Sequence, residues 1–120
     1  MSRRTPLLAL TDIRDAIRRI ERYVVGKDAR SLAHDDMARD AVERCVEIIS
    51  EASRRLPADL KATYPEIPWR EIAAIGNVFR HDYDEIEPLL VWDVVRNHLP
   101  PLKRAVAAMR RRLKQRTRGG

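Results

Sequence analysis

The 120-residue chain is poor in the residues that build disulfides, turns and sheets. Cys45 is its one cysteine, so no disulfide can form within the chain and no cysteine-based zinc site exists. Its 4 glycines and 5% aromatic residues accompany 35% charged residues, a composition that favours helices. No apolar run approaches the roughly 20 residues of a membrane-spanning helix, and the run at residues 7–10 is too short for a signal peptide. We therefore expect an all-α protein of the cytoplasm.

Acidic residues are missing from the C-terminal segment of the chain. Residues 103–120 hold eight cations and no acid, while the net charge of the whole chain is +6, so the remainder is slightly acidic. Such a basic tail attracts polyanions such as RNA, and it equally keeps a frayed helix end in solution. Both interpretations stay open on the charge alone. If the tail binds RNA, the candidate contacts are Arg110, Arg111, Arg112 and Lys114.

Apolar residues at helical spacing predict the first two of four main helices in a single domain, residues 1–120. The first is expected over residues 7–25 and ends at Gly26, with a buried face of Leu10, Ile13, Ile17, Ile20 and Val24. The second is expected over residues 36–56, because the residue before Pro57 resists the helical conformation. Its buried stripe is predicted to comprise Met37, Ala41, Cys45, Ile48, Ile49, Ala52 and Leu56.

Prolines divide the second half of the chain. One short helical turn is expected around residues 58–62, and the turn before the second helix has room for another. Pro68 suits the first position of a third helix, in which the small residues 73, 74 and 76 would let another helix approach closely. The apolar edge of this helix comprises Trp69, Ile72, Ile75 and Phe79.

The last segment keeps helical spacing across Pro100-Pro101, from Val91 to Leu113. This pattern predicts two tandem helices or one helix with a kink, with Asn97 as a cap for the restart. The expected architecture is an antiparallel bundle of four main helices plus a short connecting helix.

The stretch GNVFRHDYDEIEP, residues 76–88, gathers residues suited to acting on RNA. If the third helix reaches His81, Asn77 lies one turn before it on the same face. An imidazole titrates near neutral pH, an arginine such as Arg80 binds phosphate, and Tyr83 offers a ring or a hydroxyl. This set suits cleavage without a metal ion, in which the ribose 2′-OH attacks the adjacent phosphate. One histidine is few for two proton transfers, so we expect a two-fold dimer to bring two copies together.

A purely structural interpretation of the same residues stays open. Arg80 can pair with the acids that follow it, His81 can cap the carboxyl end of the helix, and Tyr83 can cover the edge of the core. Other chemistry has less support, because the sequence has no glycine-rich phosphate loop and its three histidines lack metal-ligand spacing. We therefore expect neither a metal ion nor a cofactor.

Three strings resemble the HepT-like proteins of the HEPN superfamily. IPWREIAAIGNVFRHDYDEIEPLLVWDVVRNHLPPLKRAV is similar to the C-terminal half of these proteins, including H-x-Y and the closing L-P-P-L. DAVERCVEIISEASRRLP resembles their second helix, where the usual string reads A-V-x-R-x-x-x-I-I-G-E-A, and LTDIRDAIRRIERYV fits the first helix. The resemblance covers roughly residues 7–113.

The resemblance implies a homodimeric helical bundle that acts as the toxin of a bacterial toxin–antitoxin pair and cleaves RNA without a metal ion. The implied partner is a minimal nucleotidyltransferase antitoxin, which transfers AMP from ATP to the motif tyrosine and silences the toxin, as in type VII systems. In the family motif R-x4-H-x-Y, His81 takes the place of the histidine and Tyr83 that of the modified tyrosine. Asn77 matches the asparagine that commonly follows the motif arginine.

The chain departs from this motif at Gly76, which stands in the place of the arginine, while Arg80 is an arginine in another register. We interpret the pair as a subtype in which Arg80 binds the phosphate. The alternative is a non-catalytic HEPN module that binds the nucleotidyltransferase, with or without RNA, and the missing arginine favours it. The acidic neighbours of Tyr83 suit docking onto a basic surface of the antitoxin.

Overall fold

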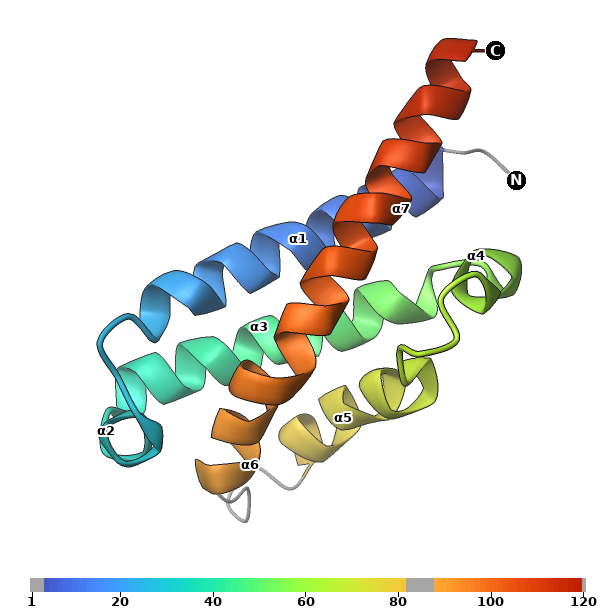
Figure 1. Ribbon diagram of the computed structural model, residues 1–120. Helices are drawn as coiled ribbons and strands as arrows, with labels where there is room; N and C mark the ends of the chain where they lie inside the picture. The colour runs from blue at the N-terminus through green and yellow to red at the C-terminus, as the bar shows by residue number, and fades with distance from the viewer. Residues whose placement is uncertain (1–3, 82–87, 120) are drawn as a thin grey trace.

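The computed structural model describes residues 4–81 and 88–119, which form helices and the turns between them (Figure 1). In chain order the elements are α1 (Arg4–Tyr23), α2 (Ala29–Ala33), α3 (Asp36–Arg54), α4 (Ala58–Ala62), α5 (Trp69–His81), α6 (Pro88–Asp93), the π-helical segment η2 (Val94–His98) and α7 (Leu99–Gly119). No strand occurs in these two ranges, and the predicted all-α class is confirmed. None of the described helices is long and apolar enough to cross a membrane.

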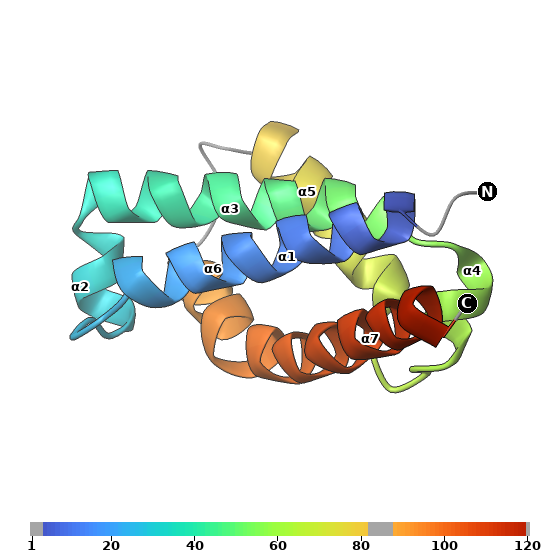
Figure 2. The same ribbon diagram turned by 90° about the horizontal axis from the view of Figure 1, so that it is seen from above.

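The four longest helices form the predicted bundle (Figures 1 and 2). α3 packs against α1 and against α5, and α7 packs against α1. α1 and α3 lie side by side and run in opposite directions, and Arg55, just after α3, pairs with Asp12 in the middle of α1 at 2.9 Å. Lys103 in α7 pairs with Glu21 near the end of α1 at 2.6 Å. The short α2 packs against α6, at the end of the bundle where the chain turns from α1 to α3.

Helical periodicity predicted most of the core. The first four residues of the α1 face are buried, and so is the last-segment series from Val91 to Leu113 apart from the half-buried Val95. Cys45 is fully buried, as expected for a small core residue. Met37 is the error, because its side chain is 85% exposed. Met37 is the second residue of α3, in the first turn of the helix. The residues that α3 buries are Val42, Glu43, Cys45, Val46, Ile49, Ser50, Ala52 and Ser53.

The helix boundaries lie within two or three residues of the predicted ones. α1 ends at Tyr23, and Gly26 follows with a φ of 74°, the left-handed conformation that glycine adopts at low cost. Pro68 directly precedes α5, and its carbonyl accepts the first bond of the helix from the Ile72 N–H at 3.0 Å. The short turn expected around residues 58–62 is α4.

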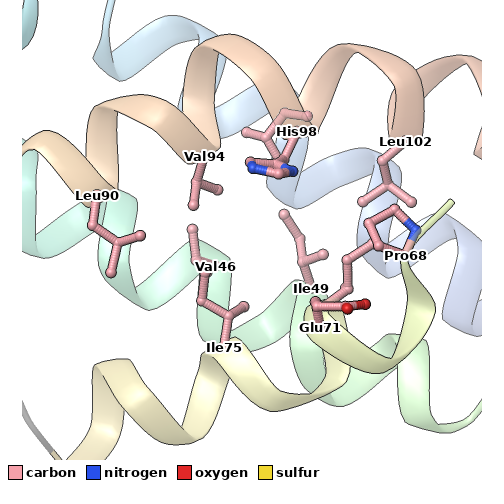
Figure 3. A pocket seen from close by; sticks show the side chains of 11 residues that line it. Val46, Ile49, Pro68, Glu71, Ile75, Leu90, Val94, His98 and Leu102 are labelled. Atoms are coloured by element: carbon pink, nitrogen blue, oxygen red, sulfur yellow. The ribbon is translucent and has the colours of Figure 1, made fainter.

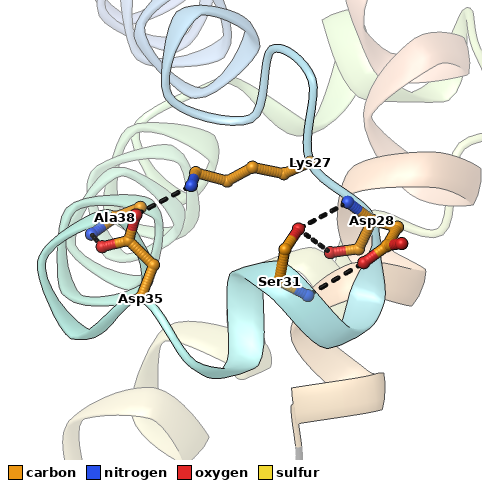
Figure 4. A network of polar contacts seen from close by, with 5 residues as sticks. All are labelled: Lys27, Asp28, Ser31, Asp35 and Ala38. Atoms are coloured by element: carbon orange, nitrogen blue, oxygen red, sulfur yellow. Dashed lines mark hydrogen bonds and ion pairs between the residues drawn. The ribbon is translucent and has the colours of Figure 1, made fainter.

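Two aspartates set the turn between α1 and α3 (Figure 4). Asp28 accepts a bond from the Ser31 N–H at 2.8 Å, while Ser31 Oγ accepts one from the Asp28 N–H at 2.9 Å, so the pair closes a capping box on α2. Asp35 caps α3 through the Ala38 N–H at 3.0 Å and accepts from Lys27 Nζ at 2.7 Å. The bond from Ser31 lowers the pKa of Asp28, and the bond from Lys27 lowers the pKa of Asp35.

The last helical segment widens where the sequence predicted a kink. The Leu99 N–H bonds to a carbonyl five residues back, and α6, η2 and α7 follow one another without a break. Pro100-Pro101 lie in the first turn of α7 and have no N–H to donate, so the π-helical turn accommodates the missing bonds. The prediction that Asn97 caps a restarted helix is wrong. The helix does not restart there, and the Asn97 amide instead donates to Asp93 Oδ1 at 2.7 Å within the turn.

Candidate functional site

The three predicted catalytic residues, Asn77, Arg80 and His81, all belong to the last part of α5. His81 is the last residue of this helix, and the exposed Asn77 lies four residues before it. Residues four apart share a helix face, so Asn77 and His81 lie on one face, as predicted. Arg80 also belongs to α5. The side chains of Arg80 and His81, and residues 82–87 with Tyr83, lie outside the described part of the structure.

The start of α5 is held by Trp69. Its half-buried indole N–H donates to the carbonyls of Lys61 and Tyr64, both at 3.1 Å. A buried indole needs such a partner, and these two carbonyls belong to α4 and the residues just after it. The bonds therefore fix the first turn of α5 to the proline-rich connection that precedes it.

Gly76, the residue interpreted as replacing the motif arginine, is buried against α3. A Cβ atom at this position would lie 2.5 Å from Ser50 Oγ and 2.7 Å from Ser50 Cβ. Both distances are shorter than any ordinary contact, so position 76 has no room for a side chain while Ser50 is present. Glycine within a helix costs about 1 kcal/mol relative to alanine. The close approach of α5 to α3, which the small residues predicted, is the physical reason for it here.

The hydroxyl group of Ser50 both donates and accepts hydrogen bonds with the backbone of α5. The hydroxyl donates to the Ala73 carbonyl at 2.8 Å and accepts from the Gly76 N–H at 3.2 Å. Arg54 Nη1 donates to the same hydroxyl at 3.2 Å and to the Ala73 carbonyl at 2.7 Å. One donor and two acceptor positions are all that a serine hydroxyl offers, so the fully buried Ser50 is satisfied. The network holds α5 at one depth and one register on α3, a turn before Arg80.

The sequence stretches that flank residues 82–87 expose apolar side chains. Val78 on α5 is 39% exposed, and Leu89 and Leu90 on α6 are 68% and 38% exposed. Single exposed apolar residues are common on protein surfaces. Here Val78 lies three residues before His81 on α5, and Leu89 and Leu90 lie in the first turn of α6.

An apolar pocket opens between α5 and the last helical segment (Figure 3). Its volume is about 230 Å³, and Glu71 and His98 are the ionisable residues in its wall. Apolar pockets with few polar groups are typical of ligand and partner sites. The remaining lining residues are Val46, Ile49, Pro68, Ile72, Ile75, Leu90, Val94, Leu99 and Leu102.

His98 has an acidic partner that the sequence did not suggest. Its Nε2 lies 3.2 Å from Asp93 Oδ2, and both side chains are about half exposed. Asp93 is five residues before His98, a spacing that an α-helix does not bring together and that the π-helical turn does. The bond from Asn97 and the proximity of His98 lower the pKa of Asp93. Within the two described ranges, no three His, Cys, Asp or Glu residues gather as metal ligands.

α3 also buries one carboxylate. Glu43 is 4% exposed, and Arg39 Nε lies 3.4 Å from its Oε1. Burial raises the pKa of Glu43, and the positive charge of Arg39 opposes that rise. Glu43 lies two turns before Ser50 on α3, on the side toward which the end of α5 runs. Its burial was not predictable from the sequence, because glutamate on a helix is ordinarily exposed.

The predicted RNA-binding residues of α7 fall into two groups. Arg111, Arg112 and Lys114 are exposed. Arg110 is partly buried and donates to Thr11 Oγ1 at 3.3 Å, and the Arg112 guanidinium lies 5.9 Å from the centre of the Tyr64 ring. Partial burial lowers the pKa of Arg110, and so do the positive charges of Arg14 and Arg18 on α1. The basic surface of α7 therefore continues onto α1.

This basic surface does not adjoin the end of α5 within one chain. α7 begins next to η2, near the α5 end, and runs away from it toward the N-terminal end of α1 (Figures 1 and 2). From Leu99 to Arg111 the helix rises by about 18 Å at 1.5 Å per residue. The structure thus groups Asn77, Arg80 and His81 on one helix and places the predicted RNA-binding residues of α7, from Arg110 onward, toward the other end of the bundle.

Comparison with known proteins relates this chain to ribonucleases. A family model described as "Ribonuclease HepT-like" matches residues 13–109, which include α5 and the first half of α7. No solved structure matches the chain at a significant level.

Individual relatives carry similar names. "Putative RNase MJ1380" of Methanocaldococcus jannaschii is 32% identical over 106 residues, which cover 88% of this chain and 97% of the relative. "Probable ribonuclease HepT" of Thermococcus cleftensis is 37% identical over 94 residues, which cover 78% of this chain and 86% of the relative. Both alignments cover most of either chain.

Proposed function

The chain belongs to the HepT-like ribonuclease family, and we propose that it is an RNA endonuclease that needs no metal ion and whose site forms at the end of α5. The observation that carries this proposal is the grouping of Asn77, Arg80 and His81 in the last turns of a helix that Ser50 fixes to α3. A site needs such rigid support, because catalytic groups must hold their geometry within fractions of an ångström.

The proposed reaction is attack of the ribose 2′-OH on the adjacent phosphorus. One imidazole takes the proton from the 2′-OH as the new P–O bond forms, and a second imidazole gives a proton to the leaving 5′-oxygen as its bond to phosphorus breaks. The products are a 2′,3′-cyclic phosphate and a 5′-OH. Arg80 neutralises the phosphate oxygens, and Asn77 offers an amide to the same group.

Two copies of His81 require two copies of the chain, so we propose a two-fold homodimer with the α5 ends facing each other. The exposed Val78, Leu89 and Leu90 support it, because they supply apolar surface beside this end of α5. In a two-fold interface the same patch meets its own copy, which brings both sets of Arg80 and His81 to one cleft.

The proposed activity is tested by incubating the purified protein with labelled RNA in the presence of EDTA. We expect endonucleolytic products that end in a cyclic phosphate, because no step of the proposed reaction uses a metal ion. The end group is identified by acid treatment, which opens the cyclic phosphate, followed by phosphatase and gel mobility. Cleavage that stops with EDTA and returns with magnesium would contradict the metal-independent mechanism.

We also propose that the chain, as a single HEPN-type domain in the cytoplasm, is the toxin of a toxin–antitoxin pair. Its partner would be a minimal nucleotidyltransferase that attaches AMP to Tyr83. This proposal rests on family membership and on the sequence around Tyr83, where Asp82, Asp84 and Glu85 suit docking to a basic partner.

Co-expression with a nucleotidyltransferase encoded beside the gene tests the modification. We expect the intact mass of the wild-type protein to rise by whole AMP units, and the mass of Tyr83→Phe to stay unmodified, since phenylalanine has no acceptor hydroxyl. Tyr64→Phe is the matched control and should be modified like the wild type. Modification of Tyr83→Phe would place the acceptor elsewhere in the chain.

A further inference from the structure

Residues 50 and 76 compete for one space between α3 and α5. The Cβ of any residue at position 76 would meet the Ser50 side chain at 2.5 and 2.7 Å, whereas the next atom, Glu47 Cα, lies at 3.8 Å. The latter distance is an ordinary van der Waals contact. The Ser50 side chain alone therefore excludes a side chain from position 76, and the backbone of α3 does not.

At both of these positions this chain differs from the strings it resembles. The usual second-helix string, A-V-x-R-x-x-x-I-I-G-E-A, has glycine where this chain has Ser50, and the motif has arginine where this chain has Gly76. These positions are 26 residues apart in sequence, yet the Gly76 N–H donates to Ser50 Oγ. These two positions, at which the sequence differs from the family strings, are thus in direct contact in the structure.

We infer that positions 50 and 76 form a coupled pair in which only one helix can carry a side chain, and that Ser50 is a positioning residue for the end of α5. In this chain α3 carries the side chain, and its hydroxyl bonds to the Ala73 carbonyl and the Gly76 N–H. These bonds set where the following turn, with Arg80 and His81, lies relative to α3. An arginine at position 76 is admitted only when position 50 has no side chain.

A double-mutant cycle tests the coupling through the melting temperature. Gly76→Arg alone should lower it by about 10 °C or more, because the added side chain forces α5 away from α3. Adding Ser50→Gly to Gly76→Arg should return the melting temperature to that of Ser50→Gly alone. Adding Ser50→Ala should not, because alanine keeps the Cβ at position 50, which lies 2.7 Å from the Cβ introduced at position 76. Ala74→Arg, on the exposed side of α5, controls for the added arginine and should change the value little.

Two results would overturn the coupling. One is a Gly76→Arg variant as stable as the wild type with Ser50 in place. The other is equal recovery with Ser50→Ala and Ser50→Gly, which would show that Cβ crowding is not the cause. Neither measurement uses RNA, so the coupling is decided even if the wild-type protein cleaves no RNA and the proposed function fails.

The positioning role of Ser50, which rests on the proposed function, has a spectroscopic test. The ring NMR signals of His81 are assigned by their loss in His81→Ala. In Ser50→Ala, which is expected to stay folded, these signals and their titration midpoint should shift, and those of His34, just after α2, should not. Where the wild type cleaves RNA, kcat should fall about tenfold with little change in KM. Unchanged His81 signals would contradict the role of Ser50 whatever the activity.

Discussion

Replacing His81 with alanine is expected to lower the rate of RNA cleavage by about 10² to 10⁴-fold, the range that a positioned general acid or base contributes. The loss should appear in kcat, because the imidazole moves protons and the phosphate is bound by other groups. The measurement is single-turnover cleavage of labelled RNA with EDTA present. His34→Ala is the matched control and should retain full activity, since His34 is exposed at the end of α2.

The same variant tests whether the two copies of the site work together. If both imidazoles of a dimer are needed, equal mixing of wild-type and His81→Ala chains leaves about a quarter of the activity after subunit exchange, because only wild-type pairs are competent. Independent sites would leave about half. Cleavage by His81→Ala at the wild-type rate would exclude the nuclease mechanism and favour a non-catalytic module that binds its partner.

The sequence was sufficient to predict the helices and most of the core, because both follow from the 3.6-residue period. Four positions of α1 and nearly all of the last segment were buried as the spacing predicted. The predicted burial of Met37 was wrong, and helical periodicity could not have shown this. A periodic pattern gives the direction of a face, but which part of the helix is covered depends on the neighbours of α3, and its first turn is exposed.

The residues of the candidate site could be predicted from the sequence, but the contacts that hold them to the other helices could not. Asn77 and His81 were placed on one face from spacing alone, and α5 does reach His81. The contact between Ser50 and Gly76 joins two helices that are distant in sequence, and nothing local in either helix predicts it. The Asp93–His98 pair depends on a π-helical turn, which follows from the way Pro100-Pro101 are accommodated.

The α5–α3 contact also changes how the missing motif arginine is understood. From sequence, glycine at position 76 suggests a lost catalytic group. In the structure the same glycine allows a bonded helix contact that leaves the end of α5 well supported. Packing against Ser50 accounts for Gly76 without loss of function, and the role of Arg80 as the phosphate-binding cation stays part of the proposed mechanism.

Reversing two of the exposed cations of α7, Arg111→Glu with Lys114→Glu, is expected to raise KM for a long RNA by about 10 to 100-fold at low salt while kcat stays unchanged. Both side chains are exposed, so the change should leave the fold intact. Arg110 and Arg112 are poorer choices, because one bonds to Thr11 and the other lies over Tyr64. The measurement is cleavage kinetics across a series of salt concentrations.

The matched control carries the same change of charge elsewhere. Arg30→Glu with Arg70→Glu alters two exposed arginines on α2 and α5, and we expect it to change KM far less. If both α7 cations contact phosphates, the slope of log KM against log salt should fall by about 1.4 in the α7 variant, at 0.7 for each lost contact with a single strand. Equal effects of the two variants would mean that net charge alone attracts the RNA.

Substrate length separates an RNA track along α7 from direct participation in the site. Arg111 lies about 18 Å along α7 from its start near the α5 end, and Lys114 lies farther, so only a substrate that spans this distance can use them. We therefore expect the α7 variant to cleave a short oligonucleotide as well as the wild type does, and a long RNA poorly. An equal loss with both substrates would instead place Arg111 and Lys114 next to His81, which requires α7 of one copy to approach α5 of the other.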